Sequence, residues 1–269
     1  MSNQKSSEET GKQDPIMRPR NKSIYLLPNA FTISSLFCGM YAIIMALSME
    51  FKQATVLIFI SMVLDSMDGR VARLTHTSSA FGAELDSLAD MVAFGISPAL
   101  VVYEWSLKYM DGRLGLVPAF VMAACAALRL ARFNTNIGIV DKRYFQGLPS
   151  PAAAALVAGF IWLMEDIGIS GDSVCWIAWV LTLYAGITMV TNVPFFSFKV
   201  MNIKKSVPFL ALILVALILT AIIFDPPTAL FGIFCFYSLS GYVIFAYRKL
   251  TGQVVNIIKS EDQIHTEVK

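Results

Sequence analysis

The sequence predicts an all-α integral membrane protein, and three observations lead to this fold class. Of its 269 residues, 56% are hydrophobic and only 15% are charged, whereas soluble domains average about 25% charged residues. The mean hydropathy of the chain is positive. The apolar residues are also grouped in blocks of about 20, the length that crosses about 30 Å of hydrocarbon as a helix. Together these features exclude an ordinary soluble domain.

Eight apolar blocks follow one another along the chain, and each is predicted to form one transmembrane helix. No short-period repeat or low-complexity tract separates them, so we expect a single membrane domain over residues 23–250. Residues 1–22 are rich in Ser, Gln, Glu and Lys and are predicted to be a disordered tail, and residues 251–269 a second polar tail. The predicted spans are 25–47, 54–74, 80–103, 114–133, 150–168, 173–192, 206–224 and 227–247.

Positive charges are distributed unevenly between the two ends of these spans. If both tails and the even-numbered turns lie on one side, that side holds 18 of the 21 Lys and Arg residues and leaves Lys52, Lys108 and Arg113 opposite. The positive-inside rule then places both termini in the cytoplasm, together with the turn between the second and third spans. We therefore expect a protein of a bacterial-type cytoplasmic membrane.

Four aspartates are concentrated around this turn. Asp65 and Asp68 stand near the end of the second span, and Asp86 and Asp90 at the start of the third. Spacings of three and four residues place each pair on one helix face, and the polar turn reverses the chain so that the two faces can meet. Each carboxylate in hydrocarbon costs about 2.5–3.5 kcal/mol, and facing carboxylates repel one another, so a cation is expected between them.

The chemistry of these side chains indicates which cation. Oxygen ligands on fixed helices suit a hard divalent ion such as Mg²⁺ or Mn²⁺, and four carboxylates are enough to hold two ions. The chain has only His76 and His265, which argues against a zinc site with nitrogen ligands. Its four cysteines are isolated within apolar blocks and lack metal-binding spacing. The sequence thus predicts a site for divalent cations at the four aspartates, with enough ligands for two ions.

Small residues and one arginine accompany the aspartates. Gly69, Ala72 and Gly82 leave space on the carboxylate face for a bulky ligand, and the guanidinium of Arg73 suits phosphate oxygens. A metal site, a nearby arginine and room for a bulky ligand together predict a binding site for a substrate that carries a pyrophosphate. Paired carboxylates within a membrane also form proton relays and cation pathways, so a non-catalytic transporter is an alternative, although a relay does not need the Gly, Ala and Arg spacing.

The pattern D-x2-D-G-x2-A-R-x8-G-x3-D-x3-D resembles the signature of the CDP-alcohol phosphatidyltransferase family. This resemblance implies six core helices, usually in a homodimer, around a polar cavity that opens to the cytoplasm and sideways to lipid. The signature also implies that the four aspartates bind a pair of divalent cations and that one of them acts as general base. All eight of its positions are matched, by Asp65, Asp68, Gly69, Ala72, Arg73, Gly82, Asp86 and Asp90.

The resemblance also implies a role for each residue of the signature. Asp90 is the expected general base as well as a metal ligand, and the small residues and Arg73 are expected to contact the cytidine diphosphate group. Asn29, in the stretch PNAFTISSLFCG, is expected to join them. The residues expected to bind the CDP-lipid are therefore Asn29, Gly69, Ala72, Arg73 and Gly82.

Other stretches resemble the phosphatidylserine synthase branch of this family. They are PNAFTISSLFCG at 28–39, RLARFN at 129–134, FQGLPSPAAA at 145–154 and TNVPFFSFK at 191–199. This likeness implies transfer of a phosphatidyl group from CDP-diacylglycerol to the hydroxyl of L-serine, with release of CMP. The paired H-x-K motifs of enzymes that use a covalent histidine are absent, so we expect a metal-dependent direct displacement.

The acceptor site is predicted at the cytoplasmic end of the fourth span. Arg129 and Arg132 lie three residues apart on one helix face, and an arginine fork is a natural receptor for the serine carboxylate. Asn134 is the third candidate for serine binding. The arginines also suit positive-inside anchoring, and inositol, inositol phosphate and glycerol-3-phosphate remain alternative acceptors. Partners are expected to be these substrates, membrane lipids and a second copy of the chain, with no nucleic acid.

Overall fold

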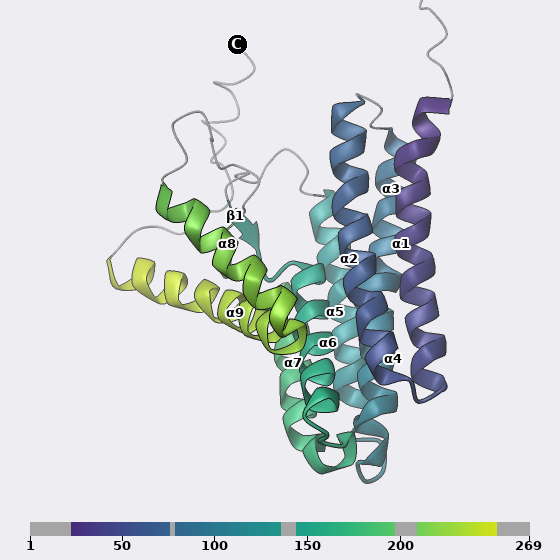
Figure 1. Cartoon of the computed structure of the whole chain (residues 1–269), viewed down its shortest axis with the longest axis vertical. Helices are drawn as coiled ribbons and strands as arrows, with labels where there is room; N and C mark the ends of the chain where they lie inside the picture. Colours follow the sequence, from purple (N-terminus) through teal and green to yellow (C-terminus); the bar gives the residue numbers. More distant parts are fainter. Residues whose placement is uncertain (1–22, 76–78, 136–143, 197–208, 252–269) are drawn as a thin grey trace, which may run out of the picture.

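The all-α membrane fold is confirmed in a computed structural model, which describes residues 23–75, 79–135, 144–196 and 209–251 (Figure 1). The predictions for residues 1–22 and 252–269 lie outside these ranges. Each predicted span corresponds to a helix or to a continuous run of helices. They are α1 (Ser23–Leu47), α2 (Phe51–Leu74), α3 (Ala80–Asp90), the π-helix η1 (Met91–Ile96), α4 (Ser97–Trp105), α5 (Leu116–Thr135), α6 (Ser150–Asp166), α7 (Cys175–Val190), α8 (Phe209–Phe224) and α9 (Pro226–Leu250).

Five of the described helical stretches are long and apolar enough to cross a membrane. They are 28–47, 80–105, 116–135, 171–190 and 226–250. The other three predicted spans differ in charge or in length. The last ten residues of α2 carry four charges, α6 has 17 residues and α8 has 16. The chain is therefore an integral membrane protein whose charged and shorter helices accompany these five.

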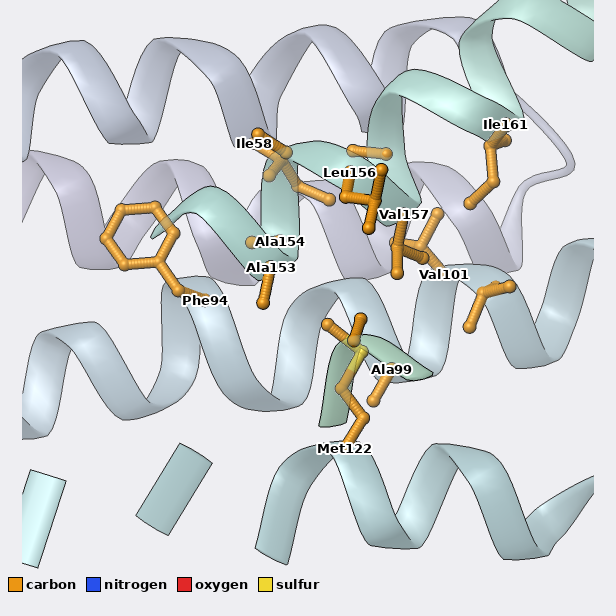
Figure 2. Packing of buried hydrophobic residues seen from close by; sticks show 14 of the residues in the cluster. Ile58, Phe94, Ala99, Val101, Met122, Ala153, Ala154, Leu156, Val157 and Ile161 are labelled. Atoms are coloured by element: carbon orange, nitrogen blue, oxygen red, sulfur yellow. The ribbon is translucent and has the colours of Figure 1, made fainter. Parts of the chain in front are cut away.

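The core of the bundle is centred on α6. Every residue from Ala152 to Ile161 is buried, so this helix is covered on all sides. Side chains from α2, α4 and α5 gather around it, including Ile58, Val101 and Met122 (Figure 2). Its alanines allow neighbouring helices to approach closely, which matters in a membrane because packing rather than water exclusion holds helices together.

Two glycines permit the closest crossings between other helices. A Cβ atom at Gly39 of α1 would lie 2.7 Å from Cα of Ala93 in η1, and one at Gly186 of α7 would lie 3.0 Å from Cα of Met122 in α5. Any side chain at these positions would push the backbones apart. The first crossing fixes the segment that directly follows Asp90, so it helps to position the acidic site.

A short two-stranded ribbon interrupts the otherwise helical architecture, and the sequence analysis did not predict it. β1 (Tyr144–Gln146) pairs antiparallel with β2 (Pro194–Phe196), and Phe145 lies opposite Phe195. The strands come from the loops after α5 and α7. Phe195 is fully buried, so the ribbon is anchored in the core rather than lying on the surface.

Helices α8 and α9 form a hairpin that runs obliquely outward from the bundle (Figure 1). Residues 212–220 of α8 are all exposed in the isolated chain, whereas the first half of α9 packs along α6. The rings of Phe160 and Phe231 are 5.8 Å apart, and a Cβ at Gly159 would lie 3.2 Å from Cα of Phe231. The hairpin is thus attached to the bundle mainly through α9.

The bundle has one end rich in arginine and one end with few cations. Lys52 starts α2 and forms an ion pair with Asp166 at 3.3 Å, and Lys108 follows α4 and pairs with Glu104 at 2.9 Å. The aspartates lie toward the opposite end of α2 and in the opposite half of the continuous stretch 80–105. The signature arginine Arg73 lies at that acidic end, close to the end of α2.

Candidate active site

Three carboxylates from two helices converge where α2 ends and α3 begins. Asp65 and Asp68 come from α2 and Asp86 from α3, and each offers an oxygen within 4.8 Å of the other two. Asp68 is only 5% exposed. Carboxylates held this closely require a positive charge among them, and oxygen-only donors on rigid helices fit a divalent cation such as Mg²⁺ or Mn²⁺.

The fourth aspartate lies beside this group and is not part of it. Asp90 interacts with Asp65, Asp86 and the guanidinium of Arg129. Its Oδ1 atom is buried and has no hydrogen-bond partner among the described residues. Burying a carboxylate oxygen without a partner costs free energy. Asp90 is therefore suited to accept a proton from a bound ligand or to bind a cation.

The chain leaves Asp90 through a π-helical turn. η1 spans Met91–Ile96 and joins α3 to α4, so the three elements together form the apolar stretch 80–105. A π-helical turn contains an extra residue relative to an α-helix and often occurs at functional sites. The extra residue changes which side chains share a helix face before and after the turn. The aspartates can therefore face the site while the buried residues that follow, such as Phe94, face the core.

Thr32 of α1 supports the acidic cluster, and the sequence analysis did not identify it. Its Oγ1 atom donates a hydrogen bond to Oδ2 of Asp68 at 2.9 Å, and the residue is 4% exposed. A donor of this kind fixes the carboxylate and leaves its other oxygen for a ligand. The only signal in the sequence was the polar series Asn29, Thr32 and Ser35, which repeats every three residues within an apolar span.

The residues expected to contact the CDP group surround the aspartates on three helices. A Cβ at Gly82 of α3 would lie 3.5 Å from Oδ1 of Asn29 in α1, so these two residues are neighbours. A Cβ at Gly69 of α2 would lie 3.8 Å from Nη1 of Arg73, so this guanidinium lies close to the glycine. Ala72 lies on the aspartate face of α2 by helical spacing.

Arg129 of α5 faces the acidic site from the other side. Its Nη1 atom donates a hydrogen bond to Oγ of Ser150, the first residue of α6, at 2.7 Å. The guanidinium also interacts with Asp90. The predicted acceptor arginine and the predicted general base therefore act on each other electrostatically.

Arg132, one turn later, has different surroundings. Its guanidinium donates hydrogen bonds to the carbonyl oxygens of Val190 and Gln146, both at 3.0 Å, and to Oδ1 of Asn192 at 3.3 Å. It thereby ties the end of α7 to the ribbon. The two arginines were predicted to act together, but the structure places one at the aspartates and the other on main-chain carbonyls.

Asn134 connects α5 to α3. Its Nδ2 atom donates a hydrogen bond to Oγ of Ser87 at 3.1 Å, and Ser87 directly follows Asp86. All three predicted serine-binding residues therefore come from the last two turns of α5, at the end of the bundle that holds the aspartates.

Comparison with known proteins places this arrangement in context. A model of the CDP-alcohol phosphatidyltransferase family matches residues 25–184, which include all four aspartates. The chain is 35% identical over 240 residues to a CDP-diacylglycerol–serine O-phosphatidyltransferase of Helicobacter pylori strain 26695, covering 89% of this chain and 97% of that protein.

Other organisms have similar proteins. A CDP-diacylglycerol–serine O-phosphatidyltransferase of Methanocaldococcus jannaschii is 34% identical over 174 residues, covering 65% of this chain and 75% of that protein. One of Saccharomyces cerevisiae is 36% identical over 152 residues, covering 51% of this chain and 54% of that protein. From the matched family model and these identities, the chain belongs to the CDP-alcohol phosphatidyltransferase family.

Proposed function

We propose that this protein is a phosphatidylserine synthase, which transfers the phosphatidyl group from CDP-diacylglycerol to the hydroxyl of L-serine and releases CMP. The observation that carries the proposal is the convergence of Asp65, Asp68 and Asp86, with Asp90 interacting electrostatically with this cluster and with Arg129. Membership of the family supports the CDP-linked donor. The acceptor is proposed from the relatives, which are named as serine transferases.

Divalent cations fit the acidic cluster, and we assign two of them, Mg²⁺ or Mn²⁺, to the four aspartates. The donors are all carboxylates, three are within 4.8 Å of one another, and the fourth has a buried oxygen without a partner. When bound, the ions would neutralise the pyrophosphate and stabilise charge on the departing CMP.

The chain itself supplies a base and positive charge for the reaction. The serine hydroxyl is a weak nucleophile, and Asp90 is placed to accept its proton as the oxygen attacks the lipid-proximal phosphorus. The phosphorus–oxygen bond to CMP breaks in the same displacement, without a phosphatidyl-enzyme intermediate. Arg73, beside Gly69, faces the phosphate oxygens, and Asn29, Ala72 and Gly82 complete the nucleotide contacts. Positioning of the two substrates and electrostatic stabilisation of the transition state then supply most of the rate enhancement.

The serine carboxylate is assigned to Arg129, because its guanidinium interacts electrostatically with the base that must reach the serine hydroxyl. Arg132 supports this end of α5 by holding the ribbon and the end of α7. Asn134, which is hydrogen-bonded to Ser87, is placed to contact the amino acid from the α3 side.

We further propose that the site and both termini face the cytoplasm, as the arginine-rich end of the bundle favours, and that two chains form a homodimer.

The acceptor is tested by supplying each candidate in turn. Purified protein with CDP-diacylglycerol and Mn²⁺ or Mg²⁺ is expected to release CMP with L-serine and not with inositol, inositol phosphate or glycerol-3-phosphate. Release with one of the other acceptors alone would assign the chain to a sibling transferase. No release with any acceptor would favour the transporter alternative.

Arg129→Ala is expected to raise the KM for L-serine by at least about tenfold, because a charge-assisted bond to the carboxylate contributes about 1.5–3 kcal/mol. The KM for CDP-diacylglycerol should change much less. Steady-state kinetics with each substrate varied in turn measure both values, and Lys249→Ala, an exposed cation in the last turn of α9, is the control. An unchanged serine requirement would move the carboxylate site elsewhere.

A further inference from the structure

The side chain of Ser150 binds a guanidinium from another helix instead of capping its own. Ser150 is the first residue of α6 and is fully buried. Serine at a helix start commonly accepts a hydrogen bond from a main-chain N–H group of the same helix. In α6 the N-cap position belongs to Pro149, which makes no side-chain cap bond. The Oγ atom of Ser150 instead accepts a hydrogen bond from Nη1 of Arg129 at 2.7 Å.

This hydroxyl still has its proton to donate. A serine hydroxyl can donate one hydrogen bond while it accepts others. The oxygen of Ser150 accepts from Arg129, and within the described parts of the chain the hydroxyl donates to no other residue. Burying a donor without a partner costs free energy, so this proton is suited to an acceptor atom of a bound ligand.

The segment before Ser150 is fixed to the end of α7, so the hydroxyl has a defined position. The main-chain N–H group of Gly147 donates to the carbonyl oxygen of Val193 at 2.9 Å. That of Leu148 donates to the carbonyl oxygen of Thr188 at 3.1 Å. Gly147 has a φ angle of +80°, which glycine adopts at little cost. A side chain held on rigid elements in this way is preorganised for binding.

The charges around Ser150 favour an anion. The N-terminus of a helix carries partial positive charge, so cations normally prefer the other end of a helix. The guanidinium of Arg129 is nevertheless bonded to the first residue of α6. The guanidinium, the hydroxyl proton and the helix N-terminus are therefore all complementary to negative charge. A carboxylate suits them, because its two oxygens can accept from a guanidinium and from a hydroxyl at the same time.

We propose that Ser150 is an acceptor-binding residue, which forms together with Arg129 a paired receptor for the carboxylate of the amino acid. This inference rests on the proposed function, in which Arg129 binds that carboxylate. The oxygen of Ser150 orients the guanidinium, and its proton is donated to a carboxylate oxygen. An acceptor without a carboxylate leaves both donors unpaired, so the pair helps to select an amino acid over a neutral alcohol.

The variant Ser150→Ala removes the hydroxyl and adds no bulk. It is expected to raise the KM for L-serine by at least about tenfold, the effect of losing a hydrogen bond to a charged group. The KM for CDP-diacylglycerol and kcat should both stay within about twofold, because the hydroxyl serves only acceptor binding. Steady-state CMP release with each substrate varied in turn measures all three values, and an unchanged kcat shows that the variant is folded.

Ser106→Ala is the matched control. Ser106 is also fully buried, and its hydroxyl donates to the carbonyl oxygen of Gly171 at 2.6 Å, at the end of the bundle opposite the aspartates. This variant loses a buried hydroxyl of the same kind but should keep both KM values within about twofold of wild type. A rise in the serine KM equal to that of Ser150→Ala would show a general packing effect and overturn the inference.

A double-mutant cycle tests whether Ser150 and Arg129 act on one carboxylate. Combining Ser150→Ala with Arg129→Lys should raise the serine KM by less than the product of the two single rises. Rises that multiply, a serine KM within about twofold of wild type in Ser150→Ala, or an equal rise for CDP-diacylglycerol would overturn the inference. Failure of the proposed function differs from these results, because the wild type itself would then not release CMP with L-serine.

Discussion

Asp90→Asn is expected to lower kcat by about 10²–10⁴-fold, the contribution of a well-placed general base. The substitution keeps the shape of the side chain and removes its ability to accept the serine proton. Asp90 is suited to this role because it interacts electrostatically with Asp65 and Asp86 of the cluster and with Arg129. CMP release under saturating substrates measures the loss.

Binding of CDP-diacylglycerol should persist in the Asp90→Asn variant, because Asp65, Asp68 and Asp86 remain in place. Calorimetric titration of the purified variant with the CDP-lipid checks this. Glu84→Gln is the matched control, since Glu84 is an exposed carboxylate on the same helix, and it should retain wild-type activity. Full activity of Asp90→Asn would remove the base assignment.

Removing divalent cations should abolish activity and weaken CDP-lipid binding. Cations at a phosphoryl centre contribute several kcal/mol, so chelation is expected to reduce CMP release by at least about 10³-fold. Without the cations, the converging carboxylates would also repel the pyrophosphate. Assays after treatment with EDTA, and again after addition of excess Mg²⁺ or Mn²⁺, measure loss and recovery.

Recovery on adding back the metal distinguishes this effect from irreversible unfolding. The melting temperature of the EDTA-treated protein provides a second control, because loss of activity without loss of the fold locates the effect in the site. Activity that persists through exhaustive chelation would contradict the assignment of the aspartates as metal ligands.

Hydropathy and spacing were sufficient to predict the helical membrane fold and the meeting of α2 with α3. The blocks of apolar residues reflect the thickness of a bilayer, so each predicted span has a helical counterpart. The aspartate spacing could be interpreted because helical geometry places residues three and four apart on one face. Asp65, Asp68 and Asp86 therefore meet as expected.

The ribbon could not be predicted, because its strands are three residues long and pair across about fifty positions of sequence. Its presence also explains why Arg129 and Arg132 have different surroundings although they share a helix face. The guanidinium of Arg132 donates its hydrogen bonds to the main-chain carbonyls of Val190 and Gln146. Periodicity locates a side chain on its own helix but does not show which distant segment packs against it.

Other features depended on tertiary contacts that a single sequence does not display. A lone hydroxyl such as that of Thr32 is common in membrane helices, and only its distance to Asp68 indicates a role. The π-helical turn contains Ala93, which packs closely against Gly39 of a distant helix. The packing of Tyr237 on Phe195 requires α9 to turn back onto the ribbon, which hydropathy alone does not indicate.

Electron paramagnetic resonance of the Mn²⁺-loaded protein tests most directly whether the converging aspartates hold a cation that binds the nucleotide-linked lipid. We expect bound Mn²⁺ in the wild type and a phosphorus hyperfine coupling when CDP-diacylglycerol is added, with both signals lost in Asp68→Asn and Asp86→Asn. Mn²⁺ bound equally well by these variants, or bound without coupling to phosphorus, would contradict the proposed centre.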